Sequence, residues 1–333
     1  MNTDVAGRVR NVQLPVSKPL MPLFETINNS IEAIADAGEP HGRIEVVVVR
    51  DESTLFTEAV SSSDRQLADI TCFEVRDNGI GFDERNYEAF NKSDTTYKAS
   101  RGGKGIGRFM WLAAFDRAEI ESVFIIDGQS KRRRFTFCPR GLGIENHSCD
   151  DAPGEKRGTI IRLVEYKERY RKQCPKRLDT IAAFIIEEFL DVFVGPSCPG
   201  ITLHDKSTSQ TIELDKFYDA EMVANSEMKQ IKIKDKSFDV LHVRLYSTHI
   251  PEHRLYLCAC YRVVTREKLT GIHNLIPRFR DDKGKEFVYA AYVSSSVLDN
   301  AVNADRTGFN LFEDSSELLT DETSLSDIRK AIR

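Results

Sequence analysis

One amphipathic stretch, residues 24–38 (FETINNSIEAIADAG), constrains the fold of this chain most strongly. Glu25 and Asn29 lie one helical turn apart beside its apolar stripe, and Gly38 predicts where the helix ends. A carboxylate beside an amide suits water activation next to Mg²⁺, because the carboxylate takes a proton while the amide oxygen ligates the cation. Taken alone, however, the stretch favours an ordinary surface helix. The apolar stripe consists of Leu20, Phe24, Ile27, Ile31 and Ile34.

Two glycine-containing motifs follow in a fixed order. Residues 77–82 (DNGIGF) close a strand-like run at 70–76, and residues 102–107 (GGKGIG) open a helix-like run at 108–115. Together with the helix that carries Glu25 and Asn29, they resemble the N, G1 and G2 boxes of the GHKL ATPases. This superfamily joins gyrase B, MutL, the ninety-kilodalton heat-shock chaperones, the MORC proteins and the histidine-kinase catalytic domain.

The resemblance implies an α+β chain that hydrolyses ATP with Mg²⁺. The first domain would be a Bergerat-type ATP-binding sandwich, in which helices cover a mixed sheet, and an S5-like α/β transducer domain would follow it. Glu25 would activate water, and Asn29 would bind Mg²⁺. Closure over ATP would drive homodimerisation, and a DNA or protein client would bind through regions missing from this sequence, because it ends abruptly inside a helix-like run.

Composition bounds the class of protein. The 333 residues are long enough for two domains, and a net charge of −5 gives no general attraction to nucleic acid or membrane. The seven cysteines form no CxxC pair, which is typical of a reducing compartment. No apolar run reaches the length of a membrane span, and no signal-peptide core is present. We therefore expect a soluble cytoplasmic protein with no membrane partner.

A polar leader and a cluster of glycines and prolines divide the chain into three predicted parts. Residues 1–19 read as an N-terminal arm, either disordered or ordered on another subunit. Residues 20–195 would form the ATP-binding domain, which closes with a helix at 178–193. Glycines and prolines at 195–200 mark the boundary, and residues 196–333 would form the transducer-like domain. The strands expected there are 201–204, 210–214, 230–233, 240–246, 256–261 and 287–293.

The adenine site is expected at the end of the strand that carries Asp77. The resemblance implies that Asp77 accepts a hydrogen bond from the exocyclic amine of adenine, with the Thr159 hydroxyl beside it. Gly79 and Gly81 would let the backbone turn tightly and approach the base. The alternative for the motif itself is a simple turn, since Asp-Asn-Gly sequences are frequent there.

The phosphate site is expected around the second glycine motif. Residues 87–101 resemble the lid that folds over the nucleotide, and Lys98 and Lys104 would neutralise phosphate charge. A Rossmann loop is disfavoured because a polar segment, not a buried strand, precedes the glycines. The backbone amides of the motif would cradle phosphate at a helix start, and its members are Gly102, Gly103, Gly105, Ile106 and Gly107.

Basic residues elsewhere allow more than one interpretation. The run at 131–134 (KRRR) is either a solvated face or a phosphate contact. Residues 298–306 (LDNAVNADR) resemble the loop with which transducer domains reach the active site. Arg306 would then bind the γ-phosphate bidentately and act as a catalytic residue. The alternative is an Arg-Thr-Gly turn.

Two classes of function remain open. The first is an ATPase that uses Glu25 as its base, and the second is an ATP-gated binding or scaffold module with slow hydrolysis. The second would be associated with DNA or protein, as in MORC and MutL, and antiviral defence is one process in which it would act. Glu25 favours the ATPase, since a sensor needs no base. It also disfavours a histidine kinase.

Overall fold

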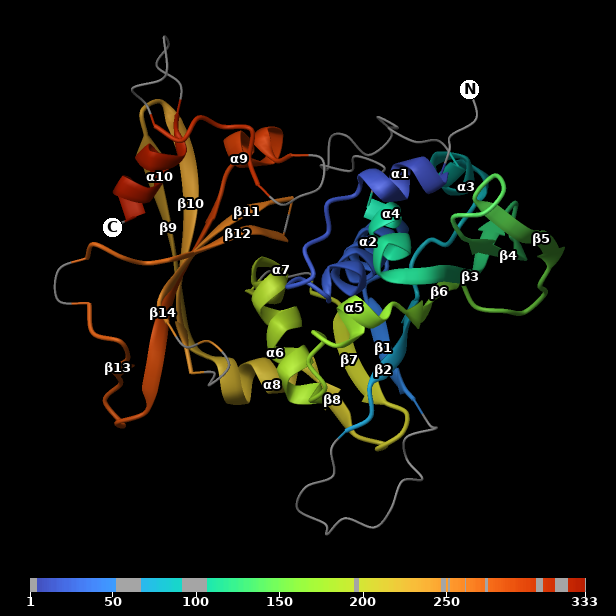
Figure 1. Ribbon diagram of the computed structural model, residues 1–333, viewed down its shortest axis with the longest axis horizontal. Coiled ribbons are helices and arrows are strands. Elements are labelled where there is room, and N and C mark those ends of the chain that lie inside the picture. The colour runs from blue at the N-terminus through green and yellow to red at the C-terminus, as the bar shows by residue number, and fades with distance from the viewer. Residues whose placement is uncertain are drawn as a thin grey trace. The chain divides into compact units, whose positions relative to one another are not determined.

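The computed structural model describes residues 5–51, 67–91, 107–194, 198–246, 250, 252–260, 262–272, 275–303, 308–314 and 323–332. The chain forms two compact units and passes between them more than once (Figure 1). The first unit contains residues 1–182 and 197–215, and the second contains residues 183–196 and 216–333. Each unit combines a sheet with helices, which confirms the predicted α+β class.

Eight strands among the described residues form one mixed sheet in the first unit. The strands β1 and β7 run parallel, and the other neighbours are antiparallel. The Asp127-Gly128 pair between the strand-like runs 119–126 and 132–138 predicts a hairpin, and one joins β3 and β4, where both residues adopt positive φ. The order across the sheet is β5 (Ile144–Asp151), β4 (Gln129–Phe137), β3 (Phe115–Ile126), β6 (Gly158–Tyr166), β2 (Ile70–Asp77), β1 (Arg43–Arg50), β7 (Gly200–Asp205) and β8 (Thr211–Glu213).

The two faces of this sheet differ, because successive side chains of a strand point to opposite sides. The inner face is apolar and packs under helices, as Val46, Val75 and Ile161 illustrate. The outer face carries charges that neutralise one another across neighbouring strands. Its ion pairs include Glu45 with Arg76, Glu74 with Arg162, Arg117 with Glu119, and Glu121 with Arg132 and Arg134.

The basic run at 131–134 is divided between these faces. Arg132 and Arg134 lie on the outer face beside Glu121, and Lys131 pairs with Asp151 at 3.7 Å. Arg133 points inward and is 2% exposed. The run therefore forms no continuous basic surface.

Helices cover the inner face of the sheet. The helix predicted from the amphipathic stretch is α2, which packs against β1, β2 and α4, while α4 packs against β3. Gly38 ends α2 as predicted, since it adopts a left-handed conformation and donates its N–H to Ala35. The helices of this unit are α1 (Val5–Asn11), α2 (Met21–Ala37), α3 (Glu84–Asn91), α4 (Gly107–Ala114), α5 (Glu168–Arg171) and the start of α6 (Leu178–Glu188).

The described part of the N-terminal arm packs on its own chain. Helix α1 packs on α4, and Val5 is buried against Gly143. The hydroxyl of Tyr170 donates to the carbonyl of Leu14 at 3.0 Å, and that of Tyr166 donates to Pro19. Burial of Val5 and hydrogen bonds from the two tyrosine hydroxyls thus fix residues 5–19 on the same chain.

The second unit contains a separate sheet with helices on both faces. Among its described strands the order is β12 (Arg262–Lys268), β11 (Arg254–Ala259), β14 (Glu286–Ser294), β10 (Lys236–Leu245) and β9 (Val223–Ile233), and β13 (Phe279–Arg280) pairs with β14. The shorter elements of this part of the chain are α7 (Leu190–Val194), α8 (Leu214–Phe217), the π-helix η3 (Tyr218–Met222), α9 (Ser296–Ala301) and α10 (Leu325–Ile332).

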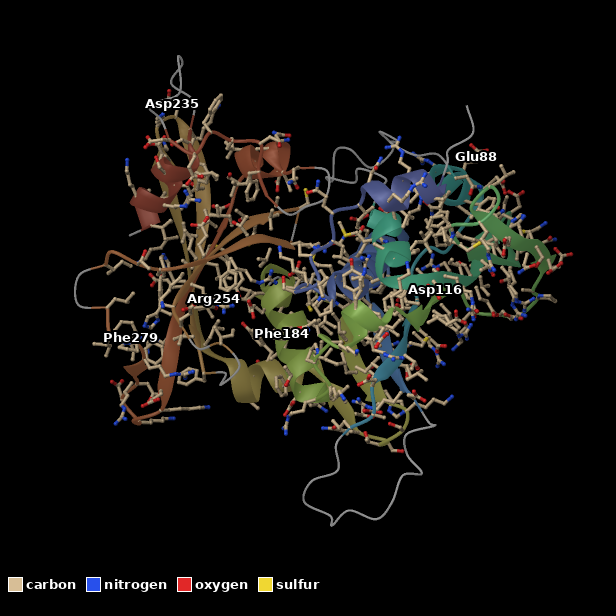
Figure 2. All side chains as sticks on the ribbon, viewed as in Figure 1. Glu88, Asp116, Phe184, Asp235, Arg254 and Phe279 are labelled. Atoms are coloured by element: carbon tan, nitrogen blue, oxygen red, sulfur yellow. The ribbon has the colours of Figure 1, made fainter. Side chains whose placement is uncertain are left out.

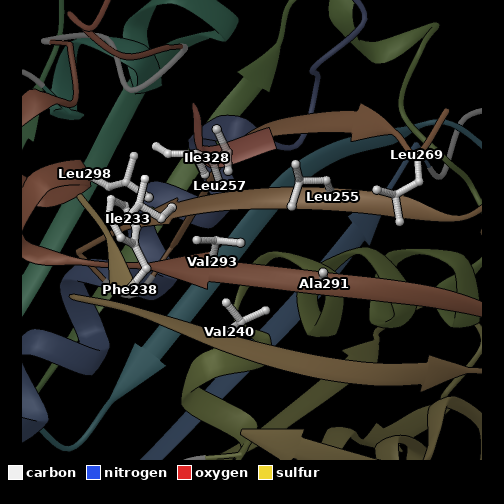
Figure 3. Close-up of a cluster of buried hydrophobic side chains, with 10 residues drawn as sticks. All are labelled: Ile233, Phe238, Val240, Leu255, Leu257, Leu269, Ala291, Val293, Leu298 and Ile328. Atoms are coloured by element: carbon white, nitrogen blue, oxygen red, sulfur yellow. The ribbon is translucent and has the colours of Figure 1, made fainter. Parts of the chain in front are cut away.

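One face of this second sheet packs under α9 and α10. Leu298 of α9 and Ile328 of α10 are fully buried in a cluster with strand residues such as Phe238 and Val293 (Figure 3).

The opposite face holds charge instead. There Glu187 and Glu188, at the end of α6, pair with Arg254, Arg262 and Arg266 of β11 and β12 (Arg254 is labelled in Figure 2).

Several expectations differ from these elements. The strand expected at 201–204 in the second domain is β7, which pairs with β1 and belongs to the first sheet, and β8 follows it there. The first part of the expected lid, residues 87–91, belongs to helix α3. Residues 296–301, expected partly as a loop, form α9, because the Ser295 side chain caps its start.

No helix in the described ranges is long and apolar enough to cross a membrane.

We predict that a buried ion pair holds the β1–β7 junction. Arg50 donates to Asp205 at 2.7 Å, both side chains are 1% exposed, and Arg50 also donates to the carbonyls of Ala68 and Lys176. Arg50→Met leaves the Asp205 carboxylate buried without its cation, so the free energy of unfolding should fall by about 3–5 kcal/mol in urea titrations. The matched control is Arg76→Met on the outer face, which removes an exposed pair with Glu45 and leaves the other partner, Glu74, paired with Arg162, so the loss should be about 0–1 kcal/mol. Equal losses in the two variants would contradict this assignment.

Candidate functional site

Asp77 is the centre of a hydrogen-bond network at the end of β2. Its carboxylate accepts from the Ser30 hydroxyl of α2 at 2.9 Å and from the Gly79 N–H at 2.8 Å. The backbone of Thr159 on β6 also donates to it. Three separate parts of the chain therefore fix one carboxylate.

Burial raises the pKa of Asp77 to about 6, although the hydrogen bonds from Gly79, Ser30 and Thr159 oppose that rise. The carboxylate is therefore ionised at neutral pH, where it acts as a hydrogen-bond acceptor. A buried carboxylate with a perturbed pKa is a frequent mark of a functional site.

The two glycines after Asp77 are required for different reasons. Gly81 has a φ of 83°, and a Cβ there would lie 2.6 Å from the carbonyl oxygen of Val123. A Cβ on Gly79 would lie 2.7 Å from Ala33 of α2. Gly79 therefore permits close packing of the loop on the helix, and its close approach to a base stays a prediction.

Helix α2 connects this network to the second glycine motif. Ser30 binds Asp77, and the carbonyl of Ala33 accepts from Ile80 N–H at 2.9 Å. Glu25 lies five residues before Ser30, about 7.5 Å along the helix axis. Asn29 lies between them and is partly exposed.

Glu25 contacts the start of α4. It is 6% exposed, and a Cβ built on Gly107 would lie only 1.7 Å from its Oε1 atom. The carboxylate therefore packs on the bare Cα of Gly107, the last residue of the GGKGIG motif. The structure thus brings together the polar face of α2 and the helix that follows this motif.

Sequence reasoning missed two residues of the network, Ser30 and Ser122. The Ser122 side chain on β3 lies 3.0 Å from the Thr159 hydroxyl and accepts from Phe82 N–H at 2.9 Å. Ser30 follows Asn29 on the polar side of the predicted helix, so its position was available from the pattern. Ser122 had no such signal, because only strand register places it opposite Thr159.

Most of the predicted phosphate-binding residues lie outside the described residues. These are Lys98, Gly102, Gly103, Lys104, Gly105, Ile106 and Arg306.

Within the described ranges, no group of three or more His, Cys, Asp or Glu side chains is suited to hold a metal ion. A Mg²⁺ held by one amide oxygen and by nucleotide phosphates requires no such group.

Comparison with models of known protein families found no match, and no curated protein matched the chain. The interpretation of the site therefore rests on its own geometry.

We predict that ionised Asp77 destabilises the fold at neutral pH. Its pKa is higher in the folded chain than in the unfolded chain, so the folded state binds more protons and stability falls as pH rises from about 4 to about 6. Asp77→Asn removes the charge, so above pH 6 it should be more stable than wild type by about 1–3 kcal/mol.

Urea unfolding at pH 4, 6 and 8 tests this expectation, because the difference should disappear at the lowest pH. Ser30→Ala removes a hydrogen bond that lowers the Asp77 pKa, so the midpoint of the pH effect should move upward. A stability difference independent of pH would show that the charge of Asp77 is not its cause.

Proposed function

We propose that the chain is a Mg²⁺-dependent ATPase of the GHKL type, whose first unit has a Bergerat-type arrangement. The observation that carries this proposal is the Asp77 network, in which a partly buried carboxylate with a raised pKa ends a central strand beside a helix with a carboxylate and an amide. An enzyme that binds adenine at one end of this helix and cleaves phosphate at the other needs this arrangement. The second unit would act as the transducer.

The residues of the Asp77 network and Glu25 each have a role in this proposal. Asp77 accepts a hydrogen bond from the exocyclic amine of adenine, because its carboxylate is ionised at neutral pH. The side chains of Thr159 and Ser122 provide the hydroxyl groups beside it. Glu25 takes the proton from the attacking water, and its burial against Gly107 restricts its position before the substrate binds.

The fit to Mg²⁺ rests on donor chemistry. Asn29 offers a neutral amide oxygen on the partly exposed side of α2, one turn from Glu25. Bound Mg²⁺ neutralises phosphate charge during phosphoryl transfer. Homodimerisation on ATP binding stays a prediction from the resemblance.

The proposal predicts that binding and hydrolysis depend on different residues. Asp77→Asn should abolish ATP binding, because an amide no longer offers the same pair of acceptor oxygens. Glu25→Gln should keep ATP affinity while turnover falls by about 10²-fold or more, the effect of losing a positioned base.

Calorimetry measures the affinity and phosphate release measures turnover. Glu32→Gln, on the same helix, is the control and should retain both. Normal turnover in Glu25→Gln would leave the ATP-gated scaffold as the better interpretation.

Gly107→Ala separates catalysis from stability. The new Cβ occupies the place of the Glu25 carboxylate, so Glu25 must move and turnover should fall by about 10-fold or more. Alanine raises helix propensity, so the thermal midpoint should not decrease. Gly200→Ala is the control, because its nearest neighbour lies 3.9 Å from the new Cβ. Unchanged turnover in Gly107→Ala would exclude Glu25, in the position described, as the base.

A further inference from the structure

The loop after Asp77 is fixed through its backbone at nearly every residue. Gly79 N–H donates to Asp77, Ile80 N–H to Ala33, and Phe82 N–H to Ser122. The side-chain amide of Asn86 on α3 donates to the carbonyl of Gly81 at 3.0 Å. The carbonyl of Asp83, at the exit of this loop, accepts from both Arg133 and the Tyr87 N–H.

Arg133 is a buried arginine with a forked set of contacts. One guanidinium nitrogen, Nη1, donates to the carbonyl of Asp83 at 2.9 Å. The other, Nη2, donates to the Glu84 carboxylate at 2.6 Å, at the first turn of α3. The guanidinium also lies 4.3 Å from the ring centroid of Tyr87, one turn further along α3.

Strand register places Arg133 in the same row as the site. Asp77 pairs directly with Thr159, Thr159 with Ser122, and Ser122 with Arg133. Directly paired residues share one face of a sheet, so these four polar side chains form a continuous row across β2, β6, β3 and β4. The rest of the inner face is mainly apolar.

Aromatic packing secures the other end of α3. Phe90 contacts Phe135 and Phe137 of β4 at centroid distances of 5.3 and 5.2 Å, and the Arg108 guanidinium of α4 lies 5.0 Å from its ring. Helix α3 buries none of its residues completely, so its position depends on side-chain contacts such as these, on the Asp83 carboxylate that caps its first turn, and on Arg133.

We infer that Arg133 is a positioning residue for nucleotide binding: it fixes the exit of the loop at 78–83 and the start of α3, and so holds the loop in the shape that receives the adenine. This inference rests on the proposed function. Its effect is on the adenine end, so it acts equally on ATP and ADP and does not reach the phosphoryl-transfer step.

The test compares two neighbouring arginines of β4 that face opposite sides. Arg133→Met should lower the affinity for both ATP and ADP by about 10-fold in calorimetry and raise KM. It should leave kcat within about twofold, because the binding energy lost is the same in the ground state and in the transition state. Arg134→Met, which removes an outer-face pair with Glu121, should change none of these values. Arg133→Lys should restore only part of the affinity, because one ammonium cannot reproduce the fork to two acceptors.

Hydrogen exchange on the nucleotide-free protein gives a readout that needs no activity. Arg133→Met should accelerate exchange of the Phe82 and Tyr87 amides, and Arg134→Met should not. Should Arg133→Met fail to fold, Arg133→Lys and Glu84→Gln carry the same comparison with smaller effects.

The outcomes separate the inference from the proposed function. Unchanged nucleotide affinity in Arg133→Met, with a wild-type protein that binds ATP, overturns the inference and leaves the ATPase proposal intact. A fall in kcat alone also overturns it. Absence of ATP and ADP binding by the wild-type protein overturns the proposed function itself.

Discussion

The row of directly paired residues Asp77, Thr159, Ser122 and Arg133 is the constraint on which the candidate site depends. A register shift of one residue in any of the four strands would turn that strand's member to the charged outer face. The buried apolar residues of the same strands resist such a shift, because it would expose them all. The strand register that buries the apolar residues thus also keeps the four polar residues in one row.

Helix α2 is the second element on which the site depends, because it touches the row at one end and α4 at the other. Ser30 and Ala33 bind the Asp77 end, and Glu25 packs on Gly107. Burying the Asp77 carboxylate raises its pKa, so the folded chain is less stable at neutral pH than it would be with a neutral side chain. A chain that retains such a cost in the middle of its sheet is consistent with a functional role for that carboxylate.

The sequence supported accurate prediction wherever local period and turn chemistry decide the outcome. The α2 stripe, its Gly38 end and the Asp127-Gly128 hairpin depend on such local signals, and so does β1, which the apolar run at 43–50 (RIEVVVVR) predicts. Predictions failed where long-range pairing decides: the strand at 200–205 joins β1 across more than a hundred residues, and Ser122 and Arg133 join the site only through register. The run at 131–134 illustrates the same limit, since its composition suggests one basic surface while alternation divides it between two faces.

The position of Glu25 is linked to the Asp77 network through α4 and β6. Gly107 begins α4 and contacts Glu25, while the ammonium of Lys167, directly after β6, donates to the carbonyl of Leu112 near the end of α4. Because Thr159 lies near the start of β6, the strand that contributes to the Asp77 network also holds the helix against which Glu25 packs. The proposed base, Glu25, and the proposed adenine acceptor, Asp77, are therefore held by one set of contacting elements, α2, α4 and β6.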